Sequence, residues 1–252
     1  MRRRLVLWAA LALPAIALVA AWSLLVPAGS KTAFLLGRPD EIAAAMARLV
    51  RTPSFWADLW ASISVLLQGY FLGVIGGFAT GLAVWYAGSY GRIAGFYLVA
   101  LGSIPLFALA PILIFVFGIG EGTRIVIVTI SVWIPMALSA SYAAIEAEAR
   151  YSELLLSLHG TRIHGLRLIV APAAFFVCLP SLKPAVNAAL VAVFLSEWIS
   201  AEQGLAKFVL ASMSVYNVPA MWVGLITFVI LGTALGLAVD WAEARLTGWR
   251  PR

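Results

Sequence analysis

Long apolar runs alternate with short polar segments along this chain. Six runs rich in Leu, Ile, Val, Ala and Phe cover residues 5–26, 60–86, 93–117, 125–145, 173–195 and 220–239. A helix rises 1.5 Å per residue, so about 20 residues suffice to cross the hydrocarbon core of a bilayer. The pattern therefore predicts an all-α membrane protein with about six transmembrane helices.

Residues 1–58 differ in pattern from the rest of the chain. The arginines Arg2–Arg4 precede the first apolar run, which predicts a transmembrane helix with a cytoplasmic N-terminus. A cleaved signal peptide, including one of the twin-arginine type, is the alternative, although the run exceeds the apolar region usual in such peptides. The mixed residues that follow are expected to lie outside, against the membrane. We therefore expect a single transmembrane domain over residues 1–252, in which 1–58 supply the first span and an external segment and 59–245 a core of five spans.

Four glycines recur at every fourth position in the second apolar run. They are Gly69, Gly73, Gly77 and Gly81. Residues at this spacing share one side of a helix, where glycines form a groove that lets another backbone approach closely. The spacing predicts helix packing, within the bundle or against a second copy of the chain, rather than a ligand site.

Two prolines, Pro105 and Pro111, interrupt the third apolar run. Proline removes a backbone hydrogen bond and kinks a helix, and kinked helices at membrane depth often line polar cavities with their freed carbonyl groups. Ser103, Ile104 and Pro105 are therefore candidates to line a path through the membrane. A kink that serves only packing is the alternative.

The longest polar interruption, Glu146 to Pro172, lies between the fourth and fifth runs. Glu146, Arg150 and Glu153 fall on one side of a helix and the leucines on another, so the segment is amphipathic. Glu146 and Arg150 can pair at i, i+4, and His159–Thr161 ends the helix. An amphipathic helix held at the membrane surface is well placed to bind a soluble partner.

Composition narrows the class further. Hydrophobic residues make up 63% of the chain and charged ones 11%, and the mean hydropathy is +1.00, which excludes a soluble globular domain. The net charge of +6 includes no basic run beyond Arg2–Arg4, so it favours loops that face an anionic lipid leaflet over nucleic-acid binding. The single cysteine, Cys178, lies in an apolar run and offers neither a disulfide nor a cysteine metal site.

Lysine and arginine are unequally distributed across the expected topology. The inner loops and ends hold Arg2, Arg3, Arg4, Arg92, Arg150, Arg162, Arg167, Arg245, Arg250 and Arg252. The outer segments hold Lys31, Arg38, Arg48, Arg51, Arg124 and Lys207. Ten against six favours six spans with both termini in the cytoplasm, since positive residues are retained on that side. Lys183 remains within a span, near its inner end, where it can extend to the lipid headgroups.

The sequence carries no signature of nucleotide, metal or catalytic chemistry. The pattern Gly-x-x-x-x-Gly-Lys-Ser/Thr does not occur, and Gly29–Thr32 lacks its Gly-Lys pair. His159 and His164 have no carboxylate or thiol at ligand spacing. No Ser-His-Asp or paired-carboxylate arrangement falls at membrane depth. We therefore expect a chain that binds no cofactor itself and is not an enzyme.

The polar segment resembles the cytoplasmic signature loop of the permease subunits of bacterial ATP-binding-cassette (ABC) importers. That loop reads Glu-Ala-Ala, with a Gly at the sixth position after the Glu and then Ile and Leu-Pro further on. Glu153, Ile169 and Pro172 keep the mutual spacing of its Glu, Ile and Pro. The positions that depart from it are Leu154 and Leu155 for the alanines, His159 for the Gly (Gly160 stands one position late) and Ala171 for the Leu.

Two further segments resemble one branch of these permeases. The run SIPLFALAPILIFVFGIGEGTR, Ser103–Arg124, is similar to the third-span signature of nitrate, sulfonate and taurine permeases, with a Pro, a later Ala-Pro and a Phe-Gly-x-Gly turn. Glu197 follows the signature loop and precedes a polar stretch ending in Gly204-Leu205, as the family commonly shows. We expect Glu197 in an external segment, where it faces the mouth of the pathway or is simply a solvated loop acid.

The resemblance extends from about residue 35 onward and implies the permease subunit of an ABC importer in the bacterial inner membrane. It implies that two copies form the pathway and that two separate ATPase subunits, which carry ATP and Mg, dock on a cytoplasmic coupling helix between spans four and five. It also implies a periplasmic solute-binding protein that delivers a small solute such as a sulfonate, taurine or nitrate. The residues assigned to ATPase coupling by the resemblance are Glu153, His159, Gly160, Thr161, Arg162, Ile169 and Pro172.

A secondary transporter or channel driven by an ion gradient is the alternative. Such proteins place ionisable groups at mid-membrane and often contain inverted repeats. No repeat relates the two halves of this chain, and Lys183 is the only charge in a span that lies away from an end. The pattern thus favours the importer.

Overall fold

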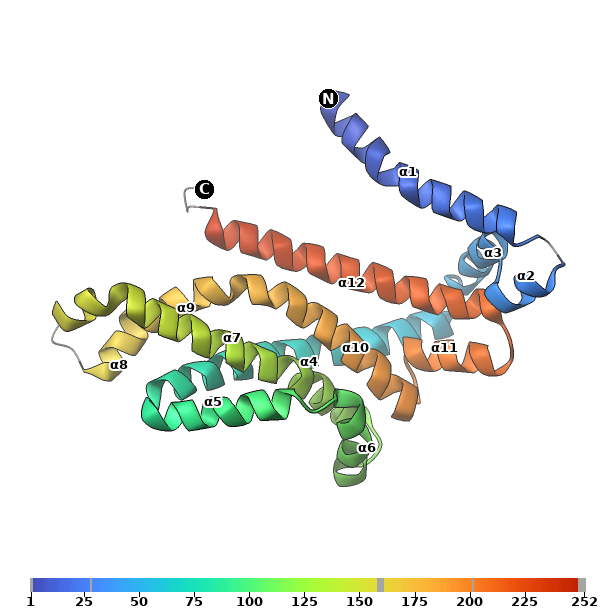
Figure 1. The fold of residues 1–252 in the computed structure, drawn as a ribbon. Helices are drawn as coiled ribbons and strands as arrows, with labels where there is room; N and C mark the ends of the chain where they lie inside the picture. Colours follow the sequence, from blue (N-terminus) through green and yellow to red (C-terminus); the bar gives the residue numbers. More distant parts are fainter. Residues whose placement is uncertain (1, 28, 158–160, 201, 249–252) are drawn as a thin grey trace.

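The computed structural model describes residues 2–27, 29–157, 161–200 and 202–248, and these residues are almost entirely helical, with no strand among them (Figure 1). The helices in chain order are α1 (Arg2–Leu25), α2 (Lys31–Leu36), α3 (Pro39–Leu49), α4 (Pro53–Tyr86), α5 (Ser89–Gly102), α6 (Leu106–Phe117), α7 (Glu121–Ser157), α8 (Arg162–Gly165), a π-helical turn (Leu166–Val170), α9 (Ala171–Cys178), a 3-10 turn (Leu179–Ser181), α10 (Leu182–Ser200), α11 (Leu205–Ser214) and α12 (Val218–Thr247). The all-α class expected from the hydrophobic pattern is confirmed.

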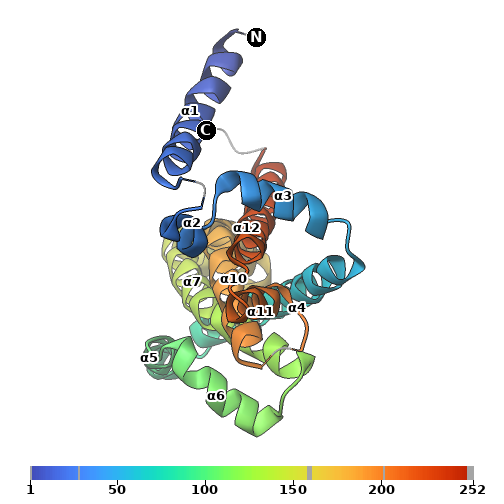
Figure 2. The same ribbon diagram turned by 90° about the vertical axis from the view of Figure 1, so that its right-hand side faces the viewer.

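Four helical segments of the described part are long and apolar enough to cross a membrane. They are α4, α7 as far as Tyr151, the stretch from α8 through α10, and α12. Shorter apolar helices cover Ile16–Leu25, Ala108–Phe117 and Leu205–Ser214. In Figures 1 and 2 the long helices α4, α7, α10 and α12 run lengthwise beside one another. A total of six spans stays a prediction.

The third apolar run does not form one continuous helix. α5 ends at Gly102, and α6 turns sharply away from it after Pro105 (Figure 1). The Oγ of Ser103 donates to the Val99 carbonyl at 2.9 Å, which closes the end of α5. Pro105 has no N–H and a ψ of 123°, so it begins a new helix instead of continuing the old one. The expected single span over 93–117 is therefore two shorter helices.

The glycine groove of α4 faces α7 of the same chain. A Cβ added to Gly69 would lie 2.5 Å from the Val128 Cβ, and one added to Gly81 would lie 2.5 Å from the Ala137 carbonyl oxygen. A Cβ added to Gly73 or Gly77 would lie 2.6 Å from atoms of α7 between these two points. The two backbones thus approach along the whole groove, because no side chain separates them. The sequence left two packing partners open for the glycine groove, a helix of the same bundle or a second copy of the chain. In the structure the partner is α7 of the same chain.

The core lies where α10 packs against this α4–α7 pair. Its fully buried members include Val65, Leu66, Ile127, Val128, Val132, Ala189 and Val193. The Tyr70 hydroxyl donates to the Leu182 carbonyl at 3.1 Å and ties the middle of α4 to the start of α10. These contacts make α4, α7 and α10 one packed unit.

The N-terminal helix projects away from the bundle (Figures 1 and 2). Trp22, near its end, meets Trp222 of α12 with ring centroids 5.1 Å apart. α3 comes after α2 in the chain and buries Ile42 and Ala45 in a cluster with Leu205 and Val223. The expected segment between the first two spans is therefore a pair of short helices, α2 and α3, packed on the ends of α11 and α12.

Candidate functional site

The loop expected to meet an ATPase begins with a kink in α7. Tyr151 has non-helical backbone angles (φ −114°, ψ 18°), so residues 152–157 form a separate short helix beyond the kink. The expected pair of Arg150 and Glu146 is confirmed, with Nη2 3.2 Å from Oε1. Both belong to the end of the long helix, however, whereas Glu153 lies past the kink. The single amphipathic helix expected from residue 146 is thus two pieces, and His159 and Gly160 lie outside the described residues.

The chain returns to the membrane through a distorted helical segment. Thr161 is extended (φ −70°, ψ 158°), exposed, and within 2.6 Å of the Nδ1 of His164. The π-helical turn that contains Ile169 ends with the Ala171 N–H bonded to the Leu166 carbonyl. Pro172 directly follows, and because it lacks an N–H it leaves a carbonyl of the preceding turn without its α-helical donor. The proline of the signature thus coincides with a widened turn that redirects the helix.

Arg162 ties this returning segment to the end of α4. Its guanidinium carbon lies 5.3 Å from the ring centroid of Trp85 and 5.4 Å from that of Tyr86. Its Nη2 also donates to the Trp85 carbonyl at 3.1 Å. The Trp85 Nε1 donates in turn to Glu148 of α7 at 2.8 Å. We call these four residues the Arg162 cluster; it joins α4, α7 and α8 through groups far apart in sequence.

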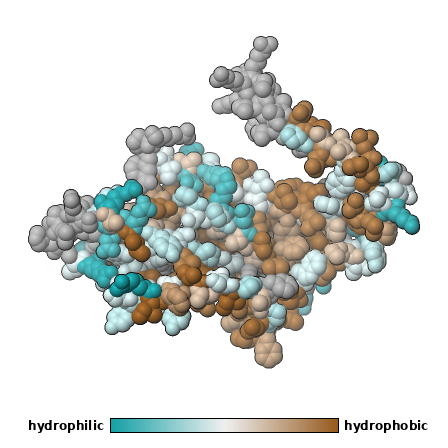
Figure 3. Space-filling view, viewed as in Figure 1, coloured by the Kyte–Doolittle hydropathy of each residue, from teal (hydrophilic) through white to brown (hydrophobic). Residues whose placement is uncertain are grey.

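Charged side chains border a cavity beside this cluster. The cavity has a volume of about 550 Å³ between α5, α7 and the end of α4. Arg92, Glu148 and Arg162 are among its lining residues. Figure 3 shows hydrophilic side chains gathered at the end of the molecule that carries α8 and the end of α7, while hydrophobic ones prevail over the middle. This end therefore has the polarity of a surface in contact with water.

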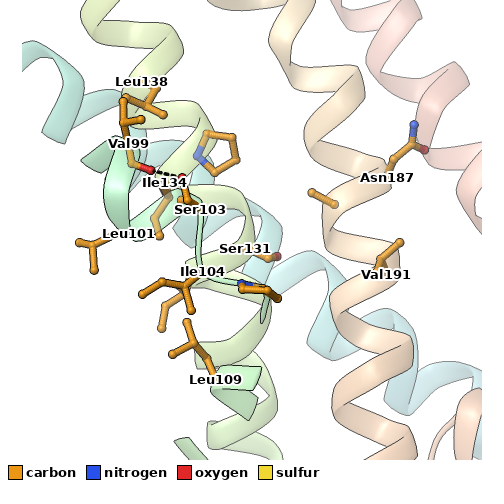
Figure 4. Close-up of a pocket in the computed structure, with 15 residues that line it drawn as sticks. Val99, Leu101, Ser103, Ile104, Leu109, Ser131, Ile134, Leu138, Asn187 and Val191 are labelled. Atoms are coloured by element: carbon orange, nitrogen blue, oxygen red, sulfur yellow. Dashed lines mark hydrogen bonds between the residues drawn. The ribbon is translucent and has the colours of Figure 1, made fainter. Parts of the chain in front are cut away.

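A larger cavity, of about 710 Å³, lies between the α5–α6 break, α7 and α10 (Figure 4). We call it the Ser103 cavity. Ser103, Ile104 and Pro105 line it, as does Asn187 on the opposite side. Its walls are otherwise apolar, apart from Ser131, whose Oγ bonds the Val128 carbonyl of its own helix. The residues that the sequence singled out around Pro105 thus share one hollow.

Glu197, the other residue expected along the pathway, lies elsewhere. It is fully buried in α10, which continues to Ser200, and so it is neither in an external loop nor at the Ser103 cavity. Its carboxylate accepts hydrogen bonds from the Ser62 Oγ at 2.6 Å and the Ala206 N–H at 2.9 Å. The Ser62 Oγ accepts from the Leu205 N–H at 2.8 Å. Glu197 therefore satisfies the free amides at the start of α11, a task that only the tertiary fold reveals.

Gly204 is required beside this carboxylate. Its φ of +141° is rarely adopted by residues with a side chain, and a Cβ there would overlap the carboxyl group of Glu197. Its N–H donates to Asp58 Oδ1 at 3.0 Å. The Gly-Leu pair noted in the sequence is thus the turn that brings α11 back onto α4 and α10.

An ion pair that the sequence did not predict joins α10 to α12. Lys183 Nζ lies 2.6 Å from Asp240 Oδ2. The Lys183 ammonium group thus has a carboxylate partner, and its extension to the headgroups stays a prediction. The two residues are 57 positions apart, so nothing local in the sequence indicated the pairing.

Comparison with known proteins settles the family. Residues 69–248 match the model of the family described as binding-protein-dependent transport system inner membrane component. The chain belongs to this family. It is a permease subunit of an ABC importer, a multi-pass protein of the inner membrane, in a family of transport permeases rather than enzymes. The resemblance drawn from the signature loop is confirmed, and the ion-gradient alternative finds no support.

Individual relatives are distant but cover most of the permease. It is 23% identical to the formylaminopyrimidine transport permease ThiX of Halalkalibacterium halodurans, over 88% of this chain and 90% of ThiX. It is also 23% identical to the taurine transport system permease TauC of Escherichia coli, over 78% of this chain and 71% of TauC. The putative aliphatic sulfonates permease SsuC of Bacillus subtilis is 21% identical over 95% of this chain and 87% of SsuC.

The fold matches solved importers as well. A chain of the inward-facing MetNI methionine ABC transporter superposes with a TM-score of 0.67 at 18% identity, over 77% of the permease and 98% of that chain. Membership in this family implies ATPase and binding-protein partners.

Proposed function

We propose that two copies of the permease form the translocation pathway and that two ATPase subunits dock on the short helix after Tyr151. ATP and Mg are held by those subunits, and this chain binds no cofactor. A periplasmic binding protein delivers the solute to the outer mouth, and both termini lie in the cytoplasm. The excess of arginine on the expected inner side supports this orientation.

The Arg162 cluster is the observation that carries the proposed coupling mechanism. A push on residues 152–157 would pass along α7 to Glu148, which accepts a hydrogen bond from Trp85 of α4. Arg162, packed on the Trp85 and Tyr86 rings, joins α8 to the same point. Since α4 packs backbone to backbone against α7, the two helices move as one body. ATP-driven approach of the ATPases would then tilt this body between inward-open and outward-open states.

A second copy is needed to complete the pathway. Helices of this chain enclose the Ser103 cavity on one side and leave its other side open. Ile104 and Val191, on its border, are exposed. Apolar walls that lack a facing partner at membrane depth suit an interface with a twin subunit around a shared path.

The proposed solute is a small anion such as a sulfonate, taurine or nitrate. Relatives named for taurine and aliphatic sulfonates support it, together with the third-span segment Ser103–Arg124. The residues that line the Ser103 cavity include no carboxylate to repel an anion, and Ser103, Ser131 and Asn187 are its polar groups. The similarity to ThiX favours a formylaminopyrimidine as the second candidate.

Replacing Glu153 with Lys tests the coupling assignment. We expect Glu153→Lys to reduce ATP-driven uptake of taurine to about one tenth or less. A lysine repels a binding surface that is complementary to a carboxylate, and a loss of ~1.4 kcal/mol in docking free energy lowers the affinity ten-fold. Uptake would be measured in vesicles with the partner ATPase and binding protein, with insertion into the membrane checked in parallel.

Glu146→Lys is the matched control. It makes the same charge change on the long-helix side of the Tyr151 kink, and we expect it to leave most of the uptake. Normal uptake by Glu153→Lys, or equal loss in both variants, would contradict the assignment.

A further inference from the structure

The Lys183–Asp240 ion pair is exposed on the surface of the single chain. The side chains retain 56% and 42% of their accessible surface, and Nζ lies 2.6 Å from Oδ2. Neither residue belongs to the signature loop or to the Arg162 cluster.

The pair lies deep within the span of the bundle. The Tyr70 hydroxyl bonds the Leu182 carbonyl, and Tyr70 occupies the middle of the 34-residue helix α4. A helix of this length extends about 51 Å, against about 30 Å of hydrocarbon. Val239, next to Asp240, is buried in the same core cluster as Tyr70. Lys183 and Asp240 are therefore at membrane depth.

Charged groups at this depth are costly against lipid and are found facing water-filled cavities or other protein. The face of α10 that carries Lys183 continues to Asn187 and Val191, each one turn further along the helix. These two residues line both the Ser103 cavity and a groove of about 390 Å³ between α10 and α12. Figure 4 shows both on one side of α10.

The same groove reaches toward Asp240 along α12. Thr233, which lines the groove, precedes Asp240 by two helical turns and so shares its side of the helix. Within the described part of the chain the Asn187 amide has no hydrogen-bond partner. The Asn187 amide therefore lies on one face of α10 between the largely apolar cavity and the Lys183 ammonium group.

We propose that Lys183 binds the transported anion on its way through the membrane and that Asp240 is its counter-ion when the path is empty. The proposal rests on the function above, in which the solute is a small anion. A sulfonate or carboxylate leaving the Ser103 cavity passes Asn187 and takes the place of the Asp240 carboxylate at the Lys183 ammonium. A lysine suits this task because its three donors rotate freely and its charge is compact, so it exchanges one oxygen ligand for another without a fixed geometry.

The first experiment measures uptake of labelled taurine by the complete transporter in proteoliposomes, with methanesulfonate as competitor. We expect Lys183→Gln to lose about ten-fold or more in uptake, as removal of one charged hydrogen bond predicts, and Lys183→Arg to keep most of it. Asp240→Asn should also keep most of it, since the solute supplies the missing negative charge.

A structural ion pair gives the opposite pattern. Lys183→Gln and Asp240→Asn would then lose activity equally, and the exchange variant Lys183→Asp with Asp240→Lys would restore it; this result overturns the inference. A wild-type complex that takes up no taurine overturns the proposed solute and this inference together. Uptake by wild type and by Lys183→Gln at equal rates overturns the inference alone.

A second experiment needs no substrate. In a Cys178→Ala background, Asn187→Cys should react with a membrane-impermeant thiol reagent added from the cytoplasmic side of inverted vesicles. Leu72→Cys, exposed on α4 two residues from Tyr70 and so closer to the level of Asn187, should not react, because we expect that side chain to face lipid. An unreactive Asn187→Cys would show that this face of α10 meets no water and would overturn the inference even in a folded, assembled complex.

Discussion

Single side chains carry the long-range links in this permease. Glu197 joins α10 to the start of α11, and Arg162 joins α8 to the end of α4. The guanidinium of Arg162 does this with a flat face for two aromatic rings and a donor for a carbonyl, which a lysine ammonium cannot offer together. At such a position the shape and the donors of the side chain therefore contribute more to the contact than its positive charge alone.

Replacing Arg162 should separate ATP use from transport. We expect Arg162→Ala to lower the amount of solute moved per ATP hydrolysed by roughly ten-fold, since two cation–π contacts and a charged hydrogen bond are lost together. Arg162→Lys should fall between alanine and wild type. The ratio would be measured in proteoliposomes; a ratio unchanged in Arg162→Ala would exclude the cluster from coupling.

At the scale of helices, the close α4–α7 pair is the rigid element of the fold. The four glycines of the groove meet backbone or Cβ atoms of α7, and Trp133 Nε1 adds a hydrogen bond to Thr80 Oγ1 at 3.0 Å. By contrast, α5 and α6 separate at Pro105, and α7 bends at Tyr151. The bends lie at the cavity and at the coupling loop, where movement is required.

Neighbouring glycines test the rigid pair. A Cβ at Gly77 would lie 2.6 Å from the Trp133 carbonyl oxygen, whereas one at Gly76 would lie 3.4 Å from the Trp133 ring. We expect Gly77→Ala to destabilise the permease by about 1–3 kcal/mol through overpacking, and Gly76→Ala to be nearly neutral. Thermal unfolding in detergent compares the two, and equal melting temperatures would show that the groove is not tight.

For the whole molecule, polarity and packing define two different ends. One carries the Arg162 cluster and the hydrophilic surface of Figure 3. The other carries the Glu197 network, where α2, α3 and α11 cover the ends of the long helices. Solute enters at the second end and ATPases act at the first in the proposed arrangement.

Thiol labelling of the two ends tests this orientation. In a Cys178→Ala background, Thr161→Cys should react with an impermeant reagent only after the inner membrane is opened, because it lies at the coupling end. Lys31→Cys, exposed in α2, should react in cells with only the outer membrane permeabilised. Labelling of Thr161→Cys from outside would reverse the topology.

The sequence by itself determined the helical membrane class, the family and the position of the signature loop. These follow from local features: the length of apolar runs, glycine spacing at one turn, and Glu153, Ile169 and Pro172 at a set interval. It also indicated Pro105 as a break, because proline acts on its own turn.

Only the tertiary structure decided how distant groups meet. Ser62 and Glu197 are 135 residues apart, Trp85 and Arg162 are 77 apart, and Lys183 and Asp240 are 57 apart. Each polar group looks like a loop or headgroup residue in the sequence, since its neighbours along the chain do not reveal its partner. Where such a group is buried, as Ser62 and Glu197 are, it requires that partner, because an unpaired buried polar group is costly, and the packing of the helices supplies it.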